Sequence, residues 1–251
     1  MNADEEAAGS LLESGLGQLG IRFDHAAISR LLSYCALVLA ANKTTNLTSA
    51  KSLGDLVTRH VLDSVAPFQA LKPASPLIDL GSGAGFPGIP LALLTPDVEV
   101  ILLEPRRKRA EFLAQAIEAL EIRNASVQQR TAAAALKNGV RAAMVMMRAV
   151  APPAASLSLG LPLVRPGGVL VLYEGHASQP TAAMRALATR GEGRINVARV
   201  LVPHLDATRH AWVVRKQASA DVSRETSGNR PNTDGSARGR RRLQRRRPGS
   251  G

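Results

Sequence analysis

Apolar residues recur at helical spacing in the first part of the chain. From Asp24, which suits an N-cap position, apolar side chains follow every three or four residues through Leu39, and this period predicts an amphipathic helix. A second run with the same period extends from Leu53 to Val65. Prolines then interrupt the pattern, so residues 1–75 are predicted to form a helical segment.

The pattern changes to short apolar runs after this segment. They lie at Leu77–Leu80, Val98–Leu103, Ala125–Gln128, Ala143–Met146 and Gly168–Tyr173. Between them, Arg106–Leu120 has one apolar face typical of a helix. Strands that alternate with helices predict an α/β fold, with a mostly parallel sheet covered by helices on both faces. Two later strand candidates, Val197–Val202 and Ala211–Arg215, predict an antiparallel hairpin at one edge.

Apolar residues almost vanish after Lys216. Residues 217–251 carry nine arginines against three acidic residues. A segment of this composition cannot offset the entropy lost on ordering and is predicted to be disordered. The expected organisation is a helical segment over 1–75, a Rossmann-like domain over 76–216 and a disordered basic tail over 217–251.

Composition and charge narrow the class of protein. The 251 residues are 45% hydrophobic, enough for one sizeable core, and carry a net charge of +12. This charge suits a polyanion such as nucleic acid, although GC-rich coding would give the same excess of arginine. The single cysteine, Cys35, lies in an apolar run and is expected to be buried. An acidic amino terminus without signal-peptide features predicts a soluble cytoplasmic protein.

A glycine-rich turn follows the first predicted strand. Gly81, Gly83 and Gly85 let the backbone pass close to a ligand, and the alternative is an ordinary tight strand-to-helix connection. Glu104 ends the next predicted strand, about 20 residues downstream, where a carboxylate would reach the hydroxyls of a ribose. The pattern favours a nucleoside-containing cofactor.

Asp79 bears on which nucleoside cofactor is bound. A dinucleotide would place its pyrophosphate on the glycine turn, next to this carboxylate. S-adenosylmethionine instead carries an ammonium and a sulfonium, which a carboxylate favours. Asp79 therefore favours S-adenosylmethionine, and the alternative is that it only caps the turn.

Four motifs, in their order and spacing, resemble a known family. They are Asn46-Leu-Thr48, Arg59-His-Val-Leu-Asp63-Ser64, the stretch from Asp79 to Pro90, and Arg148-Ala149. Together they resemble the RsmG family, also called GidB, and the likeness extends from about Ile21 to Lys216, including Pro203–Asp206 and Arg209–Val213. The resemblance implies a class I S-adenosylmethionine-dependent methyltransferase fold and methyl transfer to N7 of a guanine in 16S ribosomal RNA.

The resemblance also implies roles for individual residues. It places Asp79, Gly81, Gly83, Gly85, Phe86, Glu104, Thr131, Ala132 and Arg148 around the cofactor, with Glu104 at the ribose and residues 131 and 132 at the adenine. On the substrate side it places Asn46, Arg59, His60 and Asp63. On spacing alone, a surface pair of Arg59 with Asp63 and a core His60 would be favoured. The implied partner is 16S rRNA or the small ribosomal subunit, and the enzyme is expected to be a monomer without metal or membrane attachment.

The implied chemistry needs no proton transfer, because N7 of neutral guanine has a lone pair and no proton. No residue is therefore nominated as an obligatory general base. Phe86 and Tyr173 are candidates for stacking on a base or equally for core packing. Three positions depart from the family pattern: Ala41 replaces a tryptophan, Ala132 an acid and Glu174 a frequent lysine.

Two other functions fit part of the pattern. The glycine turn alone would suit an oxidoreductase that uses a nucleotide cofactor, although no hydride-transfer constellation is evident. The basic tail alone would suit a non-catalytic RNA-binding or assembly protein. Titration with S-adenosylmethionine and NAD distinguishes a methyltransferase from an oxidoreductase. A methyl-transfer assay distinguishes it from a non-catalytic RNA-binding protein.

Overall fold

The structure is a computed structural model that describes residues 3–174, 179–205 and 207–218. The helices are α1 (Ala3–Gln18), α2 (His25–Thr45), α3 (Leu53–Leu56), α4 (Asp63–Val65), α5 (Gly88–Leu94), α6 (Arg107–Ala119), α7 (Ala132–Lys137), α8 (Pro153–Gly160) and α9 (Ala182–Thr189), with the π-helix η1 (Val57–Leu62) and the 3₁₀ helices η2 (Ala66–Gln69) and η3 (Leu161–Leu163). The strands are β1 (Leu77–Leu80), β2 (Val100–Leu103), β3 (Ala125–Gln128), β4 (Ala142–Arg148), β5 (Val164–Glu174), β6 (Gly193–Val202) and β7 (Ala207–Lys216). Every predicted strand is confirmed, and β4 to β7 are longer than predicted.

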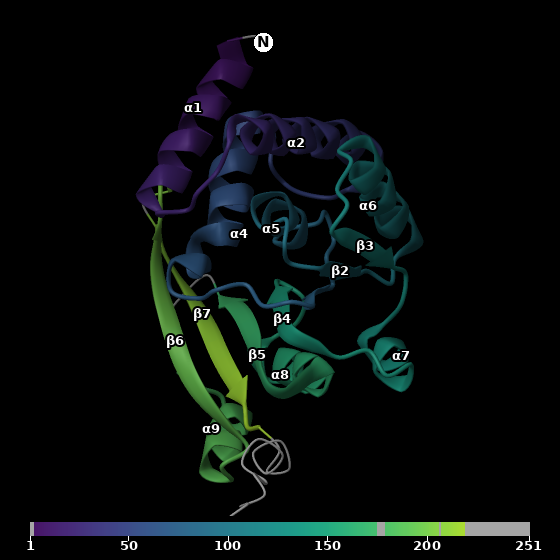
Figure 1. Cartoon of the computed structure of the whole chain (residues 1–251), viewed down its shortest axis with the longest axis vertical. Helices are drawn as coiled ribbons and strands as arrows, with labels where there is room; N and C mark the ends of the chain where they lie inside the picture. Colours follow the sequence, from purple (N-terminus) through teal and green to yellow (C-terminus); the bar gives the residue numbers. More distant parts are fainter. Residues whose placement is uncertain (1–2, 175–178, 206, 219–251) are drawn as a thin grey trace, which may run out of the picture. The chain divides into compact units, whose positions relative to one another are not determined.

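The strands form one sheet with the order β3-β2-β1-β4-β5-β7-β6 (Figure 1). Neighbours from β3 to β5 run parallel, whereas β7 pairs antiparallel with β5 and β6. The α/β prediction and the antiparallel edge hairpin are both confirmed. The chain order reverses at β1, which pairs with β2 on one side and β4 on the other. In such sheets ligands bind outside the carboxyl ends of the strands at this point.

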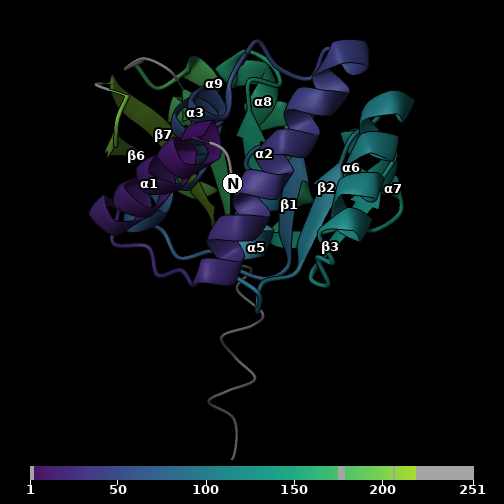
Figure 2. The same cartoon turned by 90° about the horizontal axis from the view of Figure 1, so that it is seen from above.

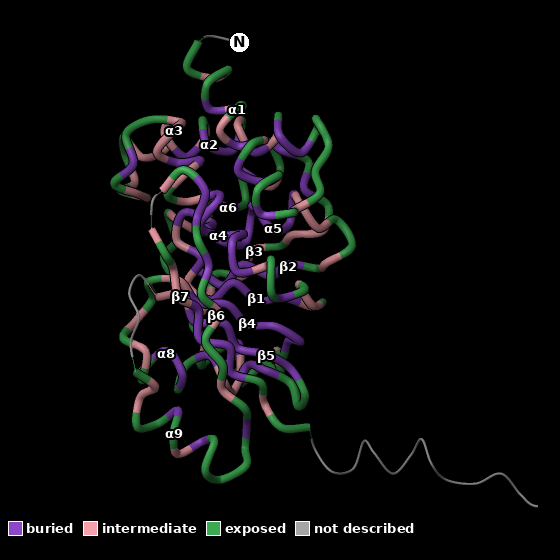
Figure 3. Tube along the Cα trace, turned by 90° about the vertical axis from the view of Figure 1, so that its left-hand side faces the viewer, coloured by how far each residue is buried: buried purple, intermediate pink, exposed green. Residues whose placement is uncertain are grey.

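Helices cover both faces of the sheet and bury two separate apolar clusters (Figure 2). Alternate strand residues point to opposite faces, so Leu102 joins one cluster and Leu103 the other. The larger cluster includes apolar side chains of α1, α2, α5 and α6, and the smaller one those of α8 and α9. Figure 3 shows the central strands as buried and much of the outer helix surface as exposed. The amino-terminal helices therefore share a core with the sheet.

Two local predictions in α2 are confirmed. Asp24 is its N-cap, and its side chain accepts a hydrogen bond from the amide of Ala27 at 2.7 Å. Cys35 is fully buried in the larger cluster, where burial raises the pKa of its thiol to about 12. The thiol is therefore a packing group and not a reactive thiolate.

The predicted tail falls mostly outside the described residues, which end at Ala218. Residues 175–178 and Asp206, part of the Pro203–Asp206 motif, also lie outside them. Gln217 is described, and its amide donates to the carbonyl of Glu192 at 2.9 Å. No helix within the described ranges is long and apolar enough to cross a membrane.

Candidate active site

The glycine turn joins β1 to α5 at the carboxyl edge of the sheet. The amide of Gly81 donates to the carbonyl of Leu103 at 2.8 Å, which fastens the turn to the end of β2. Gly81, Gly83 and Gly85 all have positive φ, at 75°, 58° and 92°. A side chain at Gly85 would also come within 2.5 Å of the Tyr34 hydroxyl. The glycines are required by the backbone conformation, and Gly85 also by close packing.

Asp79 is buried below this turn, with a residue exposure of 1%. Its Oδ2 accepts a hydrogen bond from the amide of Gly88 at 2.9 Å, at the start of α5. Burial raises the pKa of this carboxyl to about 7, against the opposing effects of the Gly88 amide and the nearby Arg148. The observed contact agrees with the alternative that Asp79 caps the turn. A contact of Asp79 with a cofactor stays a prediction.

Glu104 lies at the end of β2, beside the glycine turn, as predicted. Its Oε2 accepts from the amide of Gly83 at 2.8 Å, and its Oε1 accepts from the amide of Arg106 at 2.9 Å. Each carboxylate oxygen keeps a second acceptor direction. The pair of oxygens could therefore accept two further hydroxyl donors while still holding the turn.

Phe86 packs between aromatic neighbours instead of standing free for a base. Its ring stacks on His60 with a centroid separation of 4.9 Å and lies 5.1 Å from the ring of Tyr34. The Tyr34 hydroxyl donates to the carbonyl of Ala84 in the same turn. Phe86 is buried, so the core-packing alternative applies to it. This aromatic contact joins the glycine turn to the helix that carries His60.

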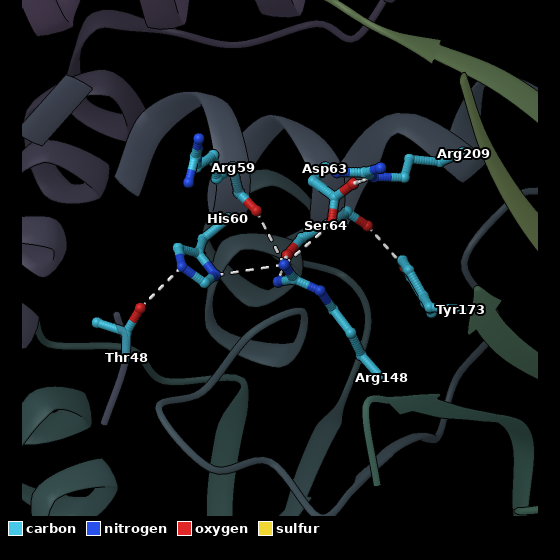
Figure 4. A network of polar contacts seen from close by, with 8 residues as sticks. All are labelled: Thr48, Arg59, His60, Asp63, Ser64, Arg148, Tyr173 and Arg209. Carbon is cyan, nitrogen blue, oxygen red and sulfur yellow. Dashed lines mark hydrogen bonds and ion pairs between the residues drawn. The ribbon is translucent and has the colours of Figure 1, made fainter. Parts of the chain in front are cut away.

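The position of His60 in a polar network fixes its tautomer (Figure 4). Its Nδ1 lies 3.3 Å from Nη2 of Arg148, and its Nε2 lies 2.8 Å from Oγ1 of Thr48. A guanidinium can only donate, so Nδ1 accepts and Nε2 carries the hydrogen that it donates to Thr48. Burial, followed by the charges of Arg148 and Arg59, lowers the pKa of His60 to about 4. The ring is therefore neutral at physiological pH.

Asp63 is the centre of the same network. Its side chain is 8% exposed and binds two arginines: Oδ2 lies 2.9 Å from Nη2 of Arg148, and Oδ1 lies 2.8 Å from Nε of Arg209. Arg148 comes from the end of β4 and Arg209 from β7, so one carboxylate ties two strands to α4. Tyr173 adds a third strand, because its hydroxyl donates to the carbonyl of Ser64 at 2.6 Å.

Two residues predicted on the substrate side, Arg59 and Asn46, have side chains outside the polar contacts of His60 and Asp63, and their role stays a prediction. The Arg59 side chain is 65% exposed, and its Nε lies 3.9 Å from Asp55, so the expected pair with Asp63 does not form. Only the Arg59 carbonyl joins the network, as an acceptor from Arg148 at 2.8 Å. Asp63 instead binds Arg148 and Arg209, and Arg59 pairs with Asp55 four residues before it.

Asn46 is the second of these residues. It ends α2 in the left-handed conformation, at φ 49°, and its carbonyl accepts from Nη2 of Arg109 at 3.3 Å. In place of Asn46, its neighbour Thr48 binds His60. The motif Asn46-Leu-Thr48 thus contributes to two different clusters.

Thr131 and Ala132 lie at the start of α7. The Thr131 hydroxyl accepts from the amide of Ala134 at 3.2 Å and caps this helix. Ala132 is the first residue of the helix. Their proximity to an adenine stays a prediction.

Arg209 and Thr48 are network members that received no role from the sequence. Both lie in motifs that carry the resemblance, and this membership is the sequence feature that could have indicated a role for them. Arg209 is 146 residues from Asp63 in the chain, and helical or strand periodicity does not report on a contact over this separation. No group of three or more metal-ligating side chains occurs in the described part of the chain.

Comparison with known proteins assigns the family. The profile of the family described as rRNA small subunit methyltransferase G, or GidB, matches residues 27–200. The chain belongs to this family. The ribosomal RNA small subunit methyltransferase G of Xanthomonas euvesicatoria pv. vesicatoria is 39% identical over 206 residues, which are 82% of this chain and 93% of that protein. The enzyme of the same name from Cupriavidus necator is 33% identical, over 83% of this chain and 95% of its own length.

Solved structures agree with the fold of the family. The O-methyltransferase TomG from Streptomyces achromogenes, in complex with SAM, aligns with a TM-score of 0.51 and 18% identity over 87% of this chain and 100% of its own. A putative O-methyltransferase from Klebsiella pneumoniae aligns with a TM-score of 0.53 and 12% identity, over 85% and 99%. The expected class I methyltransferase fold is confirmed.

Proposed function

We propose that the protein transfers the methyl group of S-adenosylmethionine to N7 of a guanine in the 16S ribosomal RNA of the small subunit. Membership of the family supports the reaction. The observation that carries it is the buried Glu104, which lies at the end of β2 and is bonded to the amide of Gly83. This arrangement suits the ribose hydroxyls of a nucleoside cofactor, and the buried Asp79 at the base of the turn favours a cofactor without a pyrophosphate.

The residues of the turn fit S-adenosylmethionine. Three glycines with positive φ leave the backbone at 81, 83 and 85 without side chains, and Gly83 has no atom closer than 3.7 Å to the position that a Cβ would occupy. Glu104 would accept from the ribose hydroxyls, and Thr131 and Ala132 would flank the adenine. When bound, S-adenosylmethionine supplies an electrophilic methyl group on its sulfonium.

The neutral His60 supports a mechanism without a general base. Both ring nitrogens are engaged by protein groups, Nδ1 by Arg148 and Nε2 by Thr48. With a pKa of about 4 and no free nitrogen, His60 is poorly suited to accept a proton from a substrate. Such a site would contribute mainly by positioning the base and excluding water.

His60 and Asp63 are proposed to position the RNA, and Arg148, which contacts both, is proposed to lie beside the cofactor. Arg148 stands at the end of β4, whose neighbour β1 leads into the glycine turn. It is held by Asp63, by the Arg59 carbonyl and by His60. Arg148 would thus lie between the substrate-side network and the cofactor. The proposed partner is 16S rRNA or the small subunit, and the enzyme is proposed to act as a cytoplasmic monomer without a metal.

Calorimetric titration with S-adenosylmethionine and NAD tests the cofactor directly. We expect saturable binding of S-adenosylmethionine and none of NAD. Methyl transfer from labelled S-adenosylmethionine to unmethylated 30S subunits then tests the reaction. Binding of NAD alone would favour the oxidoreductase, and RNA binding without methyl transfer would favour a non-catalytic RNA-binding protein.

A further inference from the structure

Four consecutive basic residues border a hollow beside the glycine turn. Arg106, Arg107, Lys108 and Arg109 open α6, and they line a cavity of about 450 Å³ together with Thr44, Thr45 and Asn46 at the end of α2. Three of the four basic residues are exposed, and Arg109 is half-buried. All seven lining residues are polar or charged. The hollow therefore offers hydrogen-bond donors and positive charge, and no aromatic side chain lines it.

The positive charge of this hollow is only partly neutralised. Arg107 pairs with Glu111 at 2.7 Å on the exposed surface of α6. Arg109 donates to the carbonyl of Asn46. Arg106 and Lys108 form no ion pair with any residue in the described ranges. Glu104 is close in sequence, but its carboxylate is buried and already accepts from two amides.

Arg109 connects the hollow to the candidate active site. Its Nη1 lies 3.7 Å from the position that a Cβ on Gly83 would occupy, so its guanidinium stands over the glycine turn. Its Nη2 donates to Asn46, which ends α2. A group bound in the hollow would thus lie next to the cofactor turn and not on a remote surface.

We propose that this hollow binds the phosphate backbone of the RNA substrate next to the target base. The inference rests on the proposed function, which supplies an RNA strand at the neighbouring site. Arginine, lysine, threonine and asparagine are the side chains that contact phosphate and sugar, and such contacts fix the position of a strand without reading its sequence. The absence of an aromatic lining residue fits a backbone site and not a base pocket.

The charge-neutralising double variant Arg106→Gln/Lys108→Gln tests this proposal. It spares the Arg107–Glu111 pair, the Arg109 contact and the backbone amide that binds Glu104. The matched control is Arg123→Gln/Arg194→Gln, which removes two exposed cations, one between α6 and β3 and one in β6. A second variant, Arg106→Lys/Lys108→Arg, keeps both charges.

The measurement is the affinity for 30S subunits at several salt concentrations. Loss of two phosphate contacts should lower the slope of log affinity against log salt by about 1.4 to 1.8 and weaken binding at least about ten-fold at 0.1 M salt. The control and the charge-retaining variant should match the parent. Binding of S-adenosylhomocysteine, measured by calorimetry, should be unchanged in all variants.

Two results would overturn the proposal. A slope and affinity equal to those of the parent would show that the hollow does not bind RNA. Loss of S-adenosylhomocysteine affinity with RNA binding intact would assign the hollow to the cofactor instead. Methyl transfer by the parent is measured in the same series, so a parent that binds 30S subunits without methylating them would contradict the proposed function and leave the slope comparison valid.

Discussion

Basic side chains in two regions of this molecule differ in burial and in their acidic partners. In the network around Asp63, Arg148 and Arg209 are mostly buried and each has a carboxylate oxygen within 3 Å. In the hollow at the start of α6, Arg106 and Lys108 are exposed and form no ion pair within the described ranges. The comparison suggests that the first region stabilises the fold and that the second is available to bind an anionic ligand.

The two regions differ because burial changes the cost of a charge. A buried guanidinium needs hydrogen-bonded partners, and removal of one partner leaves an uncompensated charge. An exposed arginine is solvated by water and contributes little to stability whether paired or not. Stability should therefore respond to the network, and salt-dependent binding should respond to the hollow.

Replacement of Asp63 by Ala should have the largest effect on stability. It leaves Arg148 and Arg209 without their shared carboxylate, and we expect the free energy of unfolding to fall by about 3 kcal/mol. The control is Glu111→Ala, which removes the exposed partner of Arg107 and should cost less than about 1 kcal/mol. Urea unfolding compares the two, and equal losses would refute the distinction between the regions.

Glu104 binds the amides of Gly83 in the glycine turn and of Arg106 in the hollow, and it should control cofactor affinity. Glu104→Ala should raise the dissociation constant for S-adenosylmethionine by about ten-fold to a hundred-fold, since hydrogen bonds to a charged acceptor contribute about 1.5 to 3 kcal/mol. Calorimetry measures the change. The parent should bind an analogue that lacks the ribose 2′-hydroxyl less tightly than S-adenosylmethionine. The Glu104→Ala variant should bind the two compounds with nearly equal affinity. Unchanged affinity in a folded variant would remove Glu104 from the cofactor site.

His60 should reveal its buried environment in the pH dependence of stability. Its pKa is about 4 in the folded protein against 6.5 for an ordinary histidine. Between these values the unfolded chain binds more protons, so this group makes stability fall as the pH drops from 6.5 to 4. In His60→Gln, the free energy of unfolding should therefore fall less than in the parent as the pH drops from 6.5 to 4. Urea unfolding at pH 4.5, 5.5 and 7.5 checks this, and identical pH profiles would contradict the assigned environment.

The same variant separates positioning from cofactor binding. His60→Gln should lower the rate of methyl transfer while the affinity for S-adenosylmethionine stays near the parent value. A parallel loss of cofactor binding would contradict the assignment of His60 to the substrate side. A rate profile that titrates with His60 as a base would contradict the mechanism.

The basic tail should have the smallest effect, and its removal tests whether arginine charge alone attracts RNA. Its nine arginines have no aromatic neighbour that could read a base. We propose that they act as an electrostatic tether, so removal of residues 219–251 should lower the salt dependence of RNA affinity without changing the methylated nucleotide. Identical slopes would favour a tail without a role, and a shifted methylation site would refute both interpretations.

The sheet could be predicted from the sequence because each strand has a local signal. The runs at Leu77–Leu80 and Ala125–Gln128 match β1 and β3 residue for residue. The carboxyl-edge position of Glu104 follows equally from local order along the chain. Periodicity and turn residues report on such features, because they arise from neighbours in sequence.

The grouping of the site residues could not be predicted as well. Spacing alone favours a pair of Arg59 with Asp63, but Asp63 binds Arg148 and Arg209, and the Arg59 side chain lies at the surface near Asp55. Arg209 lies in β7, where it pairs with Val200 of β6, and it is 146 residues from Asp63 in the chain. Arg148 was expected on the cofactor side, and its contacts with Asp63 and His60 are long-range. Contacts of this kind depend on tertiary packing.

The most direct test of the account is the position of the methyl group. Small subunits that lack the modification are incubated with the protein and tritiated S-adenosylmethionine, and the 16S rRNA is then cleaved chemically at N7-methylguanine. We predict one labelled guanine per 16S rRNA, methylated at N7, which disappears when the protein is omitted. Absence of label, or label on any atom other than a guanine N7, would contradict the central claim.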